Sequence, residues 1–336
     1  MCCLFGLVDI KHQLSGSEKN RIFSVLAECS EARGTDATGY ACVSRGKLII
    51  EKQPLPAHKM KFHIPRDAHI LMGHTRMTTQ GDAQRNRNNH PFLGKIPGIQ
   101  FALAHNGVLS NDTALRKKHN LPKSRIETDS YVAVQLIENQ SCLDMASIRY
   151  ACEQLKGTFN FTILDRENRL YIAKGNNPLC LSYFKKLGLY MYCSTKLILE
   201  EALEEMGYSV FFYEEIRMAD GEILQIDSRG NITRDRFKAP VSYNSFDLYN
   251  YWEPVTEEPS GYRRYMMDYA VTLGISKKEL DWLHYAGFST FDIEECIYNP
   301  SYRTLCLYES GYYDEDEQED ALYEIEYDSF KNYAWT

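Results

Sequence analysis

The chain begins with Met1, Cys2 and Cys3, and Cys2 is the first residue that could do chemistry. Removal of Met1 would give Cys2 a free α-amine beside its thiol, and cysteine is small enough to permit that removal. An α-amine titrates near pH ~7.7–8, and a thiol near ~8.5 is already partly thiolate at neutral pH. Cys2 would then carry a nucleophile and its base on one residue. Many chains that begin with Met-Cys have no such role, so the remaining motifs must decide.

Three polar stretches supply the residue types that such a nucleophile needs. They are RGTDATG (33–39), then GHTRMTTQG (73–81), which leads into NHP (89–91), and finally HNG (105–107) with ETD (127–129). In this order and at these spacings they resemble the glutaminase domain of the class II glutamine amidotransferases. That family belongs to the N-terminal-nucleophile hydrolases and includes the front half of glucosamine-6-phosphate synthase. The resemblance covers residues 2–235.

The resemblance implies that two residues bind the charged ends of glutamine. Arg76 would hold the α-carboxylate, because a guanidinium presents paired donors that match a carboxylate. Asp129 would hold the α-ammonium, and Thr79 would also contact the substrate. Outside this motif, an arginine at a strand end is usually a solvated charge, and Thr128 or Asp129 would be a helix N-cap.

Hydrolysis of an amide also requires donors that point at the developing oxyanion. The Asn106 side-chain amide and the Gly107 backbone N–H would be those donors. The alternative is a hairpin turn, for which Asn-Gly is the most typical dipeptide. Two residues depart from the family pattern, since Met77 stands where tryptophan is usual and Gln80 where histidine is usual. Both belong to the flap over the bound glutamine.

The elements that must position these residues follow from periodicity. The apolar run 4–10 predicts a buried strand that holds Cys2 at its start, and Ser15 or Ser17 can cap a helix over 18–30. Residues 82–90 are polar and predict a surface loop. Further strands are expected at 40–43, 47–51, 69–76, 101–105, 159–165, 170–173, 179–183, 189–193, 210–213 and 222–226, and helices at 131–138, 144–155 and 195–206. This alternation suits an α+β fold, a four-layer αββα sandwich of two antiparallel sheets between helical layers.

A shift in charge divides the chain near residue 240. From Val241 onward there are 20 acidic and 6 basic residues, which leaves 26 and 32 for the front part. The expected domains are therefore 1–240, the amidotransferase-like part, and 241–336, an acidic, tyrosine-rich and mainly helical region of unknown function. Nucleic-acid binding by this acidic region is disfavoured. Its helices are expected at 261–273, 277–285 and 289–297, with a solvated charge run at 314–320.

The composition also limits compartment and cofactors. No stretch reaches the ~20 apolar residues of a membrane span, and the N-terminus lacks the apolar length of a signal peptide, so we expect a cytoplasmic protein. None of the ten cysteines is spaced Cys-x-x-Cys, so neither structural zinc nor disulfides are expected. The proposed chemistry requires no metal or organic cofactor.

Three functions are consistent with these residues. In the first, the chain is a glutaminase that forms a Cys2 thioester and releases glutamate and ammonia, the latter for an unidentified acceptor protein, since residues 241–336 resemble no acceptor domain. In the second, the substrate is a γ-glutamyl amide in a peptide or conjugate. In the third, the chain binds glutamine or a protein partner without catalysis.

Overall fold

The computed structural model describes residues 2–208, 212–238, 270–271, 275–286, 288, 293, 296–297 and 300–313. The chain divides into two compact units, Met1–Val241 and Ser242–Thr336. The first unit contains both sheets and every residue of the predicted active site.

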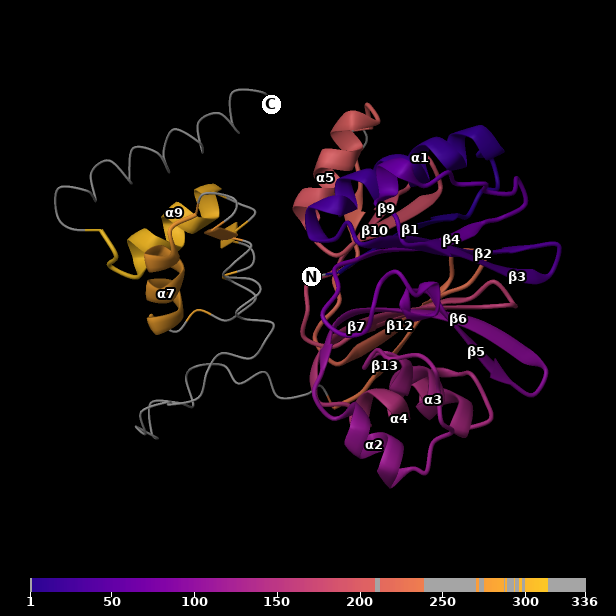
Figure 1. Ribbon diagram of the computed structural model, residues 1–336. Helices are drawn as coiled ribbons and strands as arrows, with labels where there is room; N and C mark the ends of the chain where they lie inside the picture. Colours follow the sequence, from indigo (N-terminus) through magenta and orange to yellow (C-terminus); the bar gives the residue numbers. More distant parts are fainter. Residues whose placement is uncertain are drawn as a thin grey trace. The chain divides into compact units, whose positions relative to one another are not determined.

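Two antiparallel sheets form the centre of the first unit (Figure 1). Sheet A contains, in spatial order, β11 (Glu214–Glu215), β9 (Cys180–Phe184), β10 (Leu189–Cys193), β1 (Cys3–Asp9), β4 (Ile70–Arg76), β2 (Ala37–Ser44) and β3 (Lys47–Gln53). Sheet B contains β13 (Ile232–Arg236), β12 (Glu222–Ile226), β8 (Leu170–Lys174), β7 (Gly157–Asp165), β6 (Ile99–Leu109) and β5 (Phe92–Ile96).

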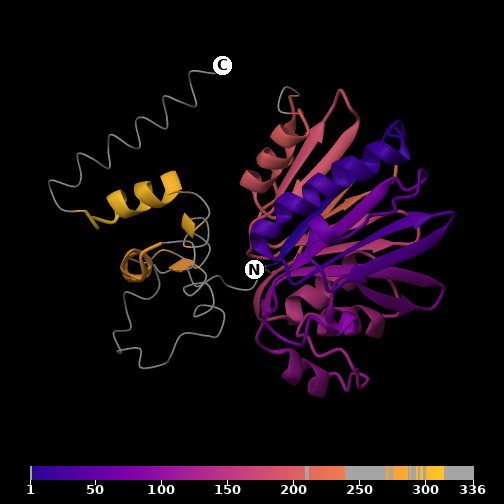
Figure 2. The ribbon, with the colours of Figure 1, turned by 45° about the horizontal axis from the view of Figure 1, so that its top comes forward.

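Helices cover the outer face of each sheet. α1 (Gly16–Cys29) and α5 (Lys196–Glu205) lie side by side over sheet A, as Figure 2 shows. α2 (Asp112–Lys118), α3 (Tyr131–Asn139) and α4 (Met145–Gln154) lie under sheet B (Figure 1). Short 3-10 turns occupy Ser30–Arg33, Ala57–Lys59 and Asn86–Asn88. The predicted four-layer αββα sandwich is confirmed.

Strand β1 shows why the sequences of the central strands are continuous apolar runs. Phe5 and Leu7 belong to the core between sheet A and its helices, whereas Leu4 and Val8 belong to the core between the two sheets. A strand buried on both faces has no polar side to alternate with. The apolar run that follows Cys2 therefore fixes Cys2 at the end of the central strand of a sheet covered on both faces.

Three sequence predictions differ from the structure. Strand β6 continues through Asn106 and Gly107, which pair with Asn160 and Phe159, so the hairpin-turn alternative is wrong. The polar stretch 82–90 is a surface loop only in part, because Asn88, Asn89 and His90 are buried. Elements β5, α2, β11 and β13 were not anticipated. The strand expected at 210–213 falls partly outside the described residues, and residues 212–213 are not in a strand.

The second unit is described only in part. Helix α7 (Lys277–Tyr285) lies where one was predicted, and α9 (Pro300–Glu309) follows it. Apolar side chains of these helices and of nearby residues form a small core. Its members are Ala270, Ile275, Leu280, Leu283, Ile293, Cys296, Ile297, Cys306 and Leu307. Most of the helices predicted at 261–273 and 289–297, and all of the charge run at 314–320, lie outside the described residues. Across the part of the chain that is described, no helix is long and apolar enough to cross a membrane.

Candidate active site

The site is built where strands β1 and β4 meet at one end of sheet A. The two strands are antiparallel neighbours, with Cys3 opposite Thr75, so Cys2 lies beside the end of β4. The Cys2 Sγ donates a hydrogen bond to the Met77 carbonyl oxygen over 3.5 Å. Adjacent strands thus bring together two motifs that are more than 70 residues apart in the sequence.

The first polar motif, residues 33–39, packs against this junction. The Arg33 Nε donates to the Cys2 carbonyl oxygen over 3.1 Å, and the Asp36 carboxylate accepts from the Thr78 N–H over 2.7 Å. At Gly34 a Cβ would lie 2.4 Å from the backbone carbon of Arg76, so only glycine fits this close approach. The motif therefore holds the backbone on both sides of the Cys2 thiol.

The charges around Cys2 come from the two residues predicted to bind substrate. Burial raises the pKa of the Cys2 thiol, the Met77 hydrogen bond and the Arg76 charge oppose the rise, and Asp129 adds to it. Both Arg76 and Asp129 therefore lie within electrostatic range of the sulfur. Cys2 nevertheless remains partly exposed, so a small molecule can reach it.

Arg76 is buried and already holds the loop that follows it. Its Nη1 donates to Asn89 Oδ1 over 2.6 Å, and its Nη2 donates to the carbonyl oxygens of Gln80 and Gly81 over 2.6 and 3.1 Å. A guanidinium has five N–H groups, so two of them remain for a ligand. A guanidinium binds a carboxylate with two N–H groups through either Nε and Nη2 or Nη1 and Nη2, so both arrangements use Nη2. Because Nη2 already donates to the Gln80 and Gly81 carbonyl oxygens, such two-point binding requires these carbonyls to move.

Asp129 is buried at the start of α3 and does not act as its N-cap. One carboxylate oxygen accepts from the Leu109 N–H over 2.6 Å, and the other accepts from the Ser130 N–H over 2.7 Å and from the Ser130 hydroxyl over 3.1 Å. The N-cap residue is Ser130, whose side chain makes no capping bond. The Asp129 carboxylate thereby ties the end of β6 to α3, and it has one acceptor direction left.

Asn106 connects sheet B to the start of β1. Its Nδ2 donates to Ser194 Oγ over 3.3 Å, and the same oxygen accepts from the Leu4 N–H over 2.8 Å. The Asn177 Nδ2 donates to the Asn106 carbonyl oxygen over 2.8 Å. Ser194 and Asn177 are thus part of the site, and the sequence analysis assigned neither a role. Asn106 Oδ1 is buried and has no hydrogen-bond partner among the described residues.

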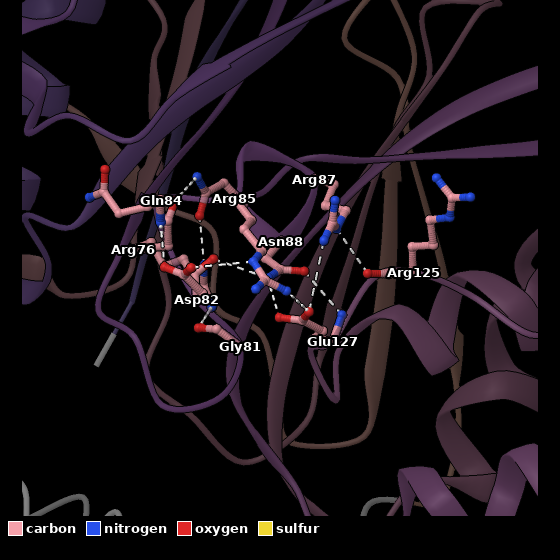
Figure 3. Close-up of polar contacts among 11 residues, drawn as sticks. Arg76, Gly81, Asp82, Gln84, Arg85, Arg87, Asn88, Arg125 and Glu127 are labelled. Atoms are coloured by element: carbon pink, nitrogen blue, oxygen red, sulfur yellow. Dashed lines mark hydrogen bonds and ion pairs between the residues drawn. The ribbon is translucent and has the colours of Figure 1, made fainter.

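A second group of contacts closes the loop after β4 against residues 125–127 (Figure 3). The Asn88 Nδ2 and the Arg85 Nη1 donate to the two carboxylate oxygens of Glu127 over 2.9 and 2.5 Å. The Gln80 Nε2 donates to the Glu127 carbonyl oxygen over 2.9 Å. Thr79, also predicted to contact substrate, is exposed on this loop and makes no side-chain hydrogen bond within the described structure. We call residues 77–89 the Glu127-bound loop.

Comparison with known proteins relates part of the chain to glutamine amidotransferases. A family model described as "Glutamine amidotransferase domain" matches residues 74–200, the span that holds Arg76, Asn106 and Asp129. The chain is 27% identical over 265 residues to glutamine--fructose-6-phosphate aminotransferase [isomerizing] of Staphylococcus aureus, a match that covers 75% of this chain and 43% of the relative. Residues 74–200 of the chain therefore match a glutamine amidotransferase domain.

Two further proteins similar to this chain have names that indicate other activities. The chain is 24% identical over 204 residues to 7-cyano-7-deazaguanine synthase 2 of Sulfurisphaera tokodaii, which covers 58% of this chain and 43% of that protein. The solved glutamine phosphoribosylpyrophosphate amidotransferase of B. subtilis shares the fold, with a TM-score of 0.57 and 22% identity over 75% of this chain and 53% of that one. The chain spans about half the length of the curated relatives it matches or less.

Proposed function

We propose that the amidotransferase domain hydrolyses the side-chain amide of glutamine through Cys2 and releases glutamate and ammonia. One observation carries the proposal: the Cys2 thiol donates to the backbone carbonyl oxygen of Met77, the residue that follows the buried guanidinium of Arg76. The charges of Arg76 and of the buried carboxylate Asp129 both act on the pKa of this thiol. A free amino acid presents one carboxylate and one ammonium group. Arg76 is positive and can bind the carboxylate, and Asp129 is negative and can bind the ammonium group. Together they can hold the substrate while the thiol faces its side chain.

The chemistry begins with removal of Met1, which gives Cys2 its α-amine. This amine takes the thiol proton, and the thiolate forms a bond to the amide carbon of glutamine. The amide oxygen becomes an oxyanion, which accepts hydrogen bonds from the Asn106 Nδ2 and the Gly107 N–H. The C–N bond then breaks as the α-ammonium returns the proton to the departing nitrogen, so ammonia leaves and a γ-glutamyl thioester remains.

Water completes the cycle. The α-amine of Cys2 accepts a proton from the attacking water, a second oxyanion forms in the same place, and its collapse breaks the C–S bond. The products are glutamate and a thiol that regains its proton. Burial raises the pKa of the thiol, which means that a base on the same residue is needed to generate the thiolate at neutral pH.

The ammonia is proposed to pass to an acceptor protein. The relatives that the chain matches are named as an aminotransferase and a synthase, and the chain spans about half of their length or less. Residues 242–336 form a separate unit, and the helices described there build only a small core. These observations support an acceptor site outside the amidotransferase domain.

The experiment is an assay of glutamate released from glutamine by the full chain after Met1 removal. We expect Cys2→Ala to abolish release, whereas Cys142→Ala, which removes an exposed cysteine elsewhere, leaves it unchanged. A parallel assay with γ-glutamyl peptides distinguishes glutamine from a larger γ-glutamyl amide. Undiminished glutamate release by Cys2→Ala would exclude the mechanism.

A further inference from the structure

A cavity with a volume of about 930 Å³ opens at the end of sheet A opposite to Cys2. It is lined by three segments: the turn after β1, the β2–β3 hairpin and the segment that precedes β4. Figure 1 shows the tip of this hairpin at the end of the sheet away from the N-terminus. Its volume lies within the range of small-molecule sites, about 300–1,000 Å³.

The cavity has an excess of positive charge. Arg45, Lys47 and Arg66 line it, are exposed, and make no side-chain hydrogen bond or ion pair among the described residues. Asp67 is the one carboxylate in the lining, and its oxygens accept from the Ser44 hydroxyl over 2.7 Å and from the Arg45 N–H over 2.8 Å. Three exposed cations therefore lie around one carboxylate, whose oxygens already accept hydrogen bonds within the hairpin.

Two histidines, His12 and His69, also line the cavity, and one of their ring nitrogens lacks a hydrogen-bond partner among the described residues. The rings of His12 and His69 meet edge to face, with their centroids 3.6 Å apart. The His69 Nδ1 is buried and has no hydrogen-bond partner in the described part of the chain. Burial, with the nearby positive charges, lowers the pKa of His69 to about 4, so the ring is a neutral hydrogen-bonding group. A buried polar atom without a partner is costly unless a ligand or water meets it.

The backbone around the cavity is also unusual. His12 and Arg45 both have left-handed φ angles, of 54° and 50°. Residues other than glycine rarely adopt this conformation, and a positive φ is most often taken by Asn or Asp when glycine is absent. Asparagine would suit the left-handed turn at position 45 equally well. The arginine found there instead places a guanidinium at the cavity.

We propose that this cavity binds a small molecule that carries a phosphate group. A phosphomonoester has a charge of about −1.5 to −2 at neutral pH, which balances the excess of two positive charges. Two guanidinium groups can donate paired hydrogen bonds to phosphate oxygens, and the His69 ring offers a further contact. The remaining volume accommodates a sugar-sized body.

The cavity and the catalytic residues lie at opposite ends of the same three strands. β1 starts next to Cys2 and ends before His12, β2 ends next to Arg45, and β4 starts after His69 and ends at Arg76. Seven residues of strand span roughly 20 Å, so the cavity is separate from the proposed glutamine site. The binding proposal does not depend on glutamine hydrolysis, and each can fail without the other.

The test is a calorimetric titration of the full chain with glucose 6-phosphate, with glucose as the uncharged control. We expect saturable binding of the phosphorylated sugar alone. The double variant Arg45→Asn, Arg66→Gln removes two cations, and asparagine preserves the left-handed turn. We expect it to weaken binding by roughly tenfold for each lost arginine. The matched control is Arg236→Gln, which removes an exposed arginine at the last residue of β13 in sheet B and leaves binding unchanged.

Hydrogen exchange on the unmodified protein gives a second readout that needs no variant. Saturation with glucose 6-phosphate is expected to slow amide exchange in residues 44–49 and 65–69, but not in sheet B. Inorganic phosphate is included to separate the phosphate from the sugar contribution, and it is expected to give weaker protection of the same segments. The proposal would be overturned by the absence of binding heat up to millimolar glucose 6-phosphate. It would also be overturned by an equal loss of binding in Arg236→Gln, or by protection only in other parts of the chain.

Discussion

Gly107 offers the sharpest test of the site geometry, because its backbone N–H is the proposed oxyanion donor. Its φ is 141°, and a Cβ added there would lie 2.0 Å from the Thr158 carbonyl oxygen and 2.8 Å from the Asn177 Nδ2. The Thr158 oxygen belongs to the neighbouring strand β7, so it cannot rotate away. Gly107→Ala must therefore separate β6 from β7 or twist the Gly107 peptide.

The cost has two parts. A side chain in this region of φ costs about 1–3 kcal/mol, and forced overpacking typically costs a further ~1–3 kcal/mol. We expect Gly107→Ala to lower the free energy of unfolding by about 2–6 kcal/mol. Gly98→Ala is the matched control, since Gly98 also has a positive φ, 78°, but no atom lies within 4 Å of the position that a Cβ would take there. That variant should lose only about 1–2 kcal/mol.

The assay is urea unfolding of both variants beside the unmodified chain, together with glutamate release at a temperature where each is folded. We expect Gly107→Ala to be the less stable variant and to lose turnover even where it is folded, because its N–H no longer points at the oxyanion. Gly98→Ala should retain full turnover. Equal stability of the two variants would refute the argument that the Thr158 carbonyl excludes a side chain at Gly107.

Three further predictions concern other parts of the site. Asn106→Ala should reduce kcat by roughly 10²–10³ with little change in KM, measured by steady-state glutamate release, because it removes a donor used mainly in the transition state. Glu127→Ala should speed amide exchange in the Glu127-bound loop and raise KM for glutamine, since it removes the carboxylate that holds Arg85 and Asn88; unchanged exchange would contradict the role given to Glu127. Burial lowers the pKa of His90 well below its ordinary value, so the unfolded chain binds a proton below about pH 6.5 that the folded chain excludes. The contribution of His90 to the free energy of unfolding is fully present above that pH and falls with acidification by up to ~1.4 kcal/mol per pH unit for each such histidine. Urea unfolding at several pH values should show that the free energy of unfolding depends less steeply on pH in His90→Gln. The exposed control His63→Gln should show no such change.

Many elements of the first unit could be predicted from periodicity and capping. Of the two serines that could start α1, Ser15 is the N-cap, because its side chain accepts from the Glu18 N–H while the Glu18 carboxylate accepts from the Ser15 N–H. Thr195, where the helix expected at 195–206 begins, is the N-cap of α5, and its side chain accepts from the Ile198 N–H. Such local patterns are readable from the sequence because both partners lie within four residues.

The contacts that complete the site were not readable in this way. Ser194 follows a strand and looks like part of a turn, yet its hydroxyl joins Asn106 to Leu4 across 88 and 190 positions of sequence. Asn89 appeared to belong to a solvated polar loop, yet it is buried, where it accepts from Arg76 and its Nδ2 donates to the Ala83 carbonyl oxygen. A polar residue whose partners are distant in sequence has the same local pattern as one bonded to water.

The central claim is that Cys2, freed of Met1, is the nucleophile of a glutamine-specific pocket. Intact-mass measurement and peptide mapping after exposure to diazo-oxo-norleucine, a glutamine-like electrophile, test it most directly. We predict a chain that lacks Met1 and carries one adduct, on Cys2, with labelling suppressed by excess glutamine. A chain that retains Met1, or an adduct on any other of the ten cysteines, would contradict the account.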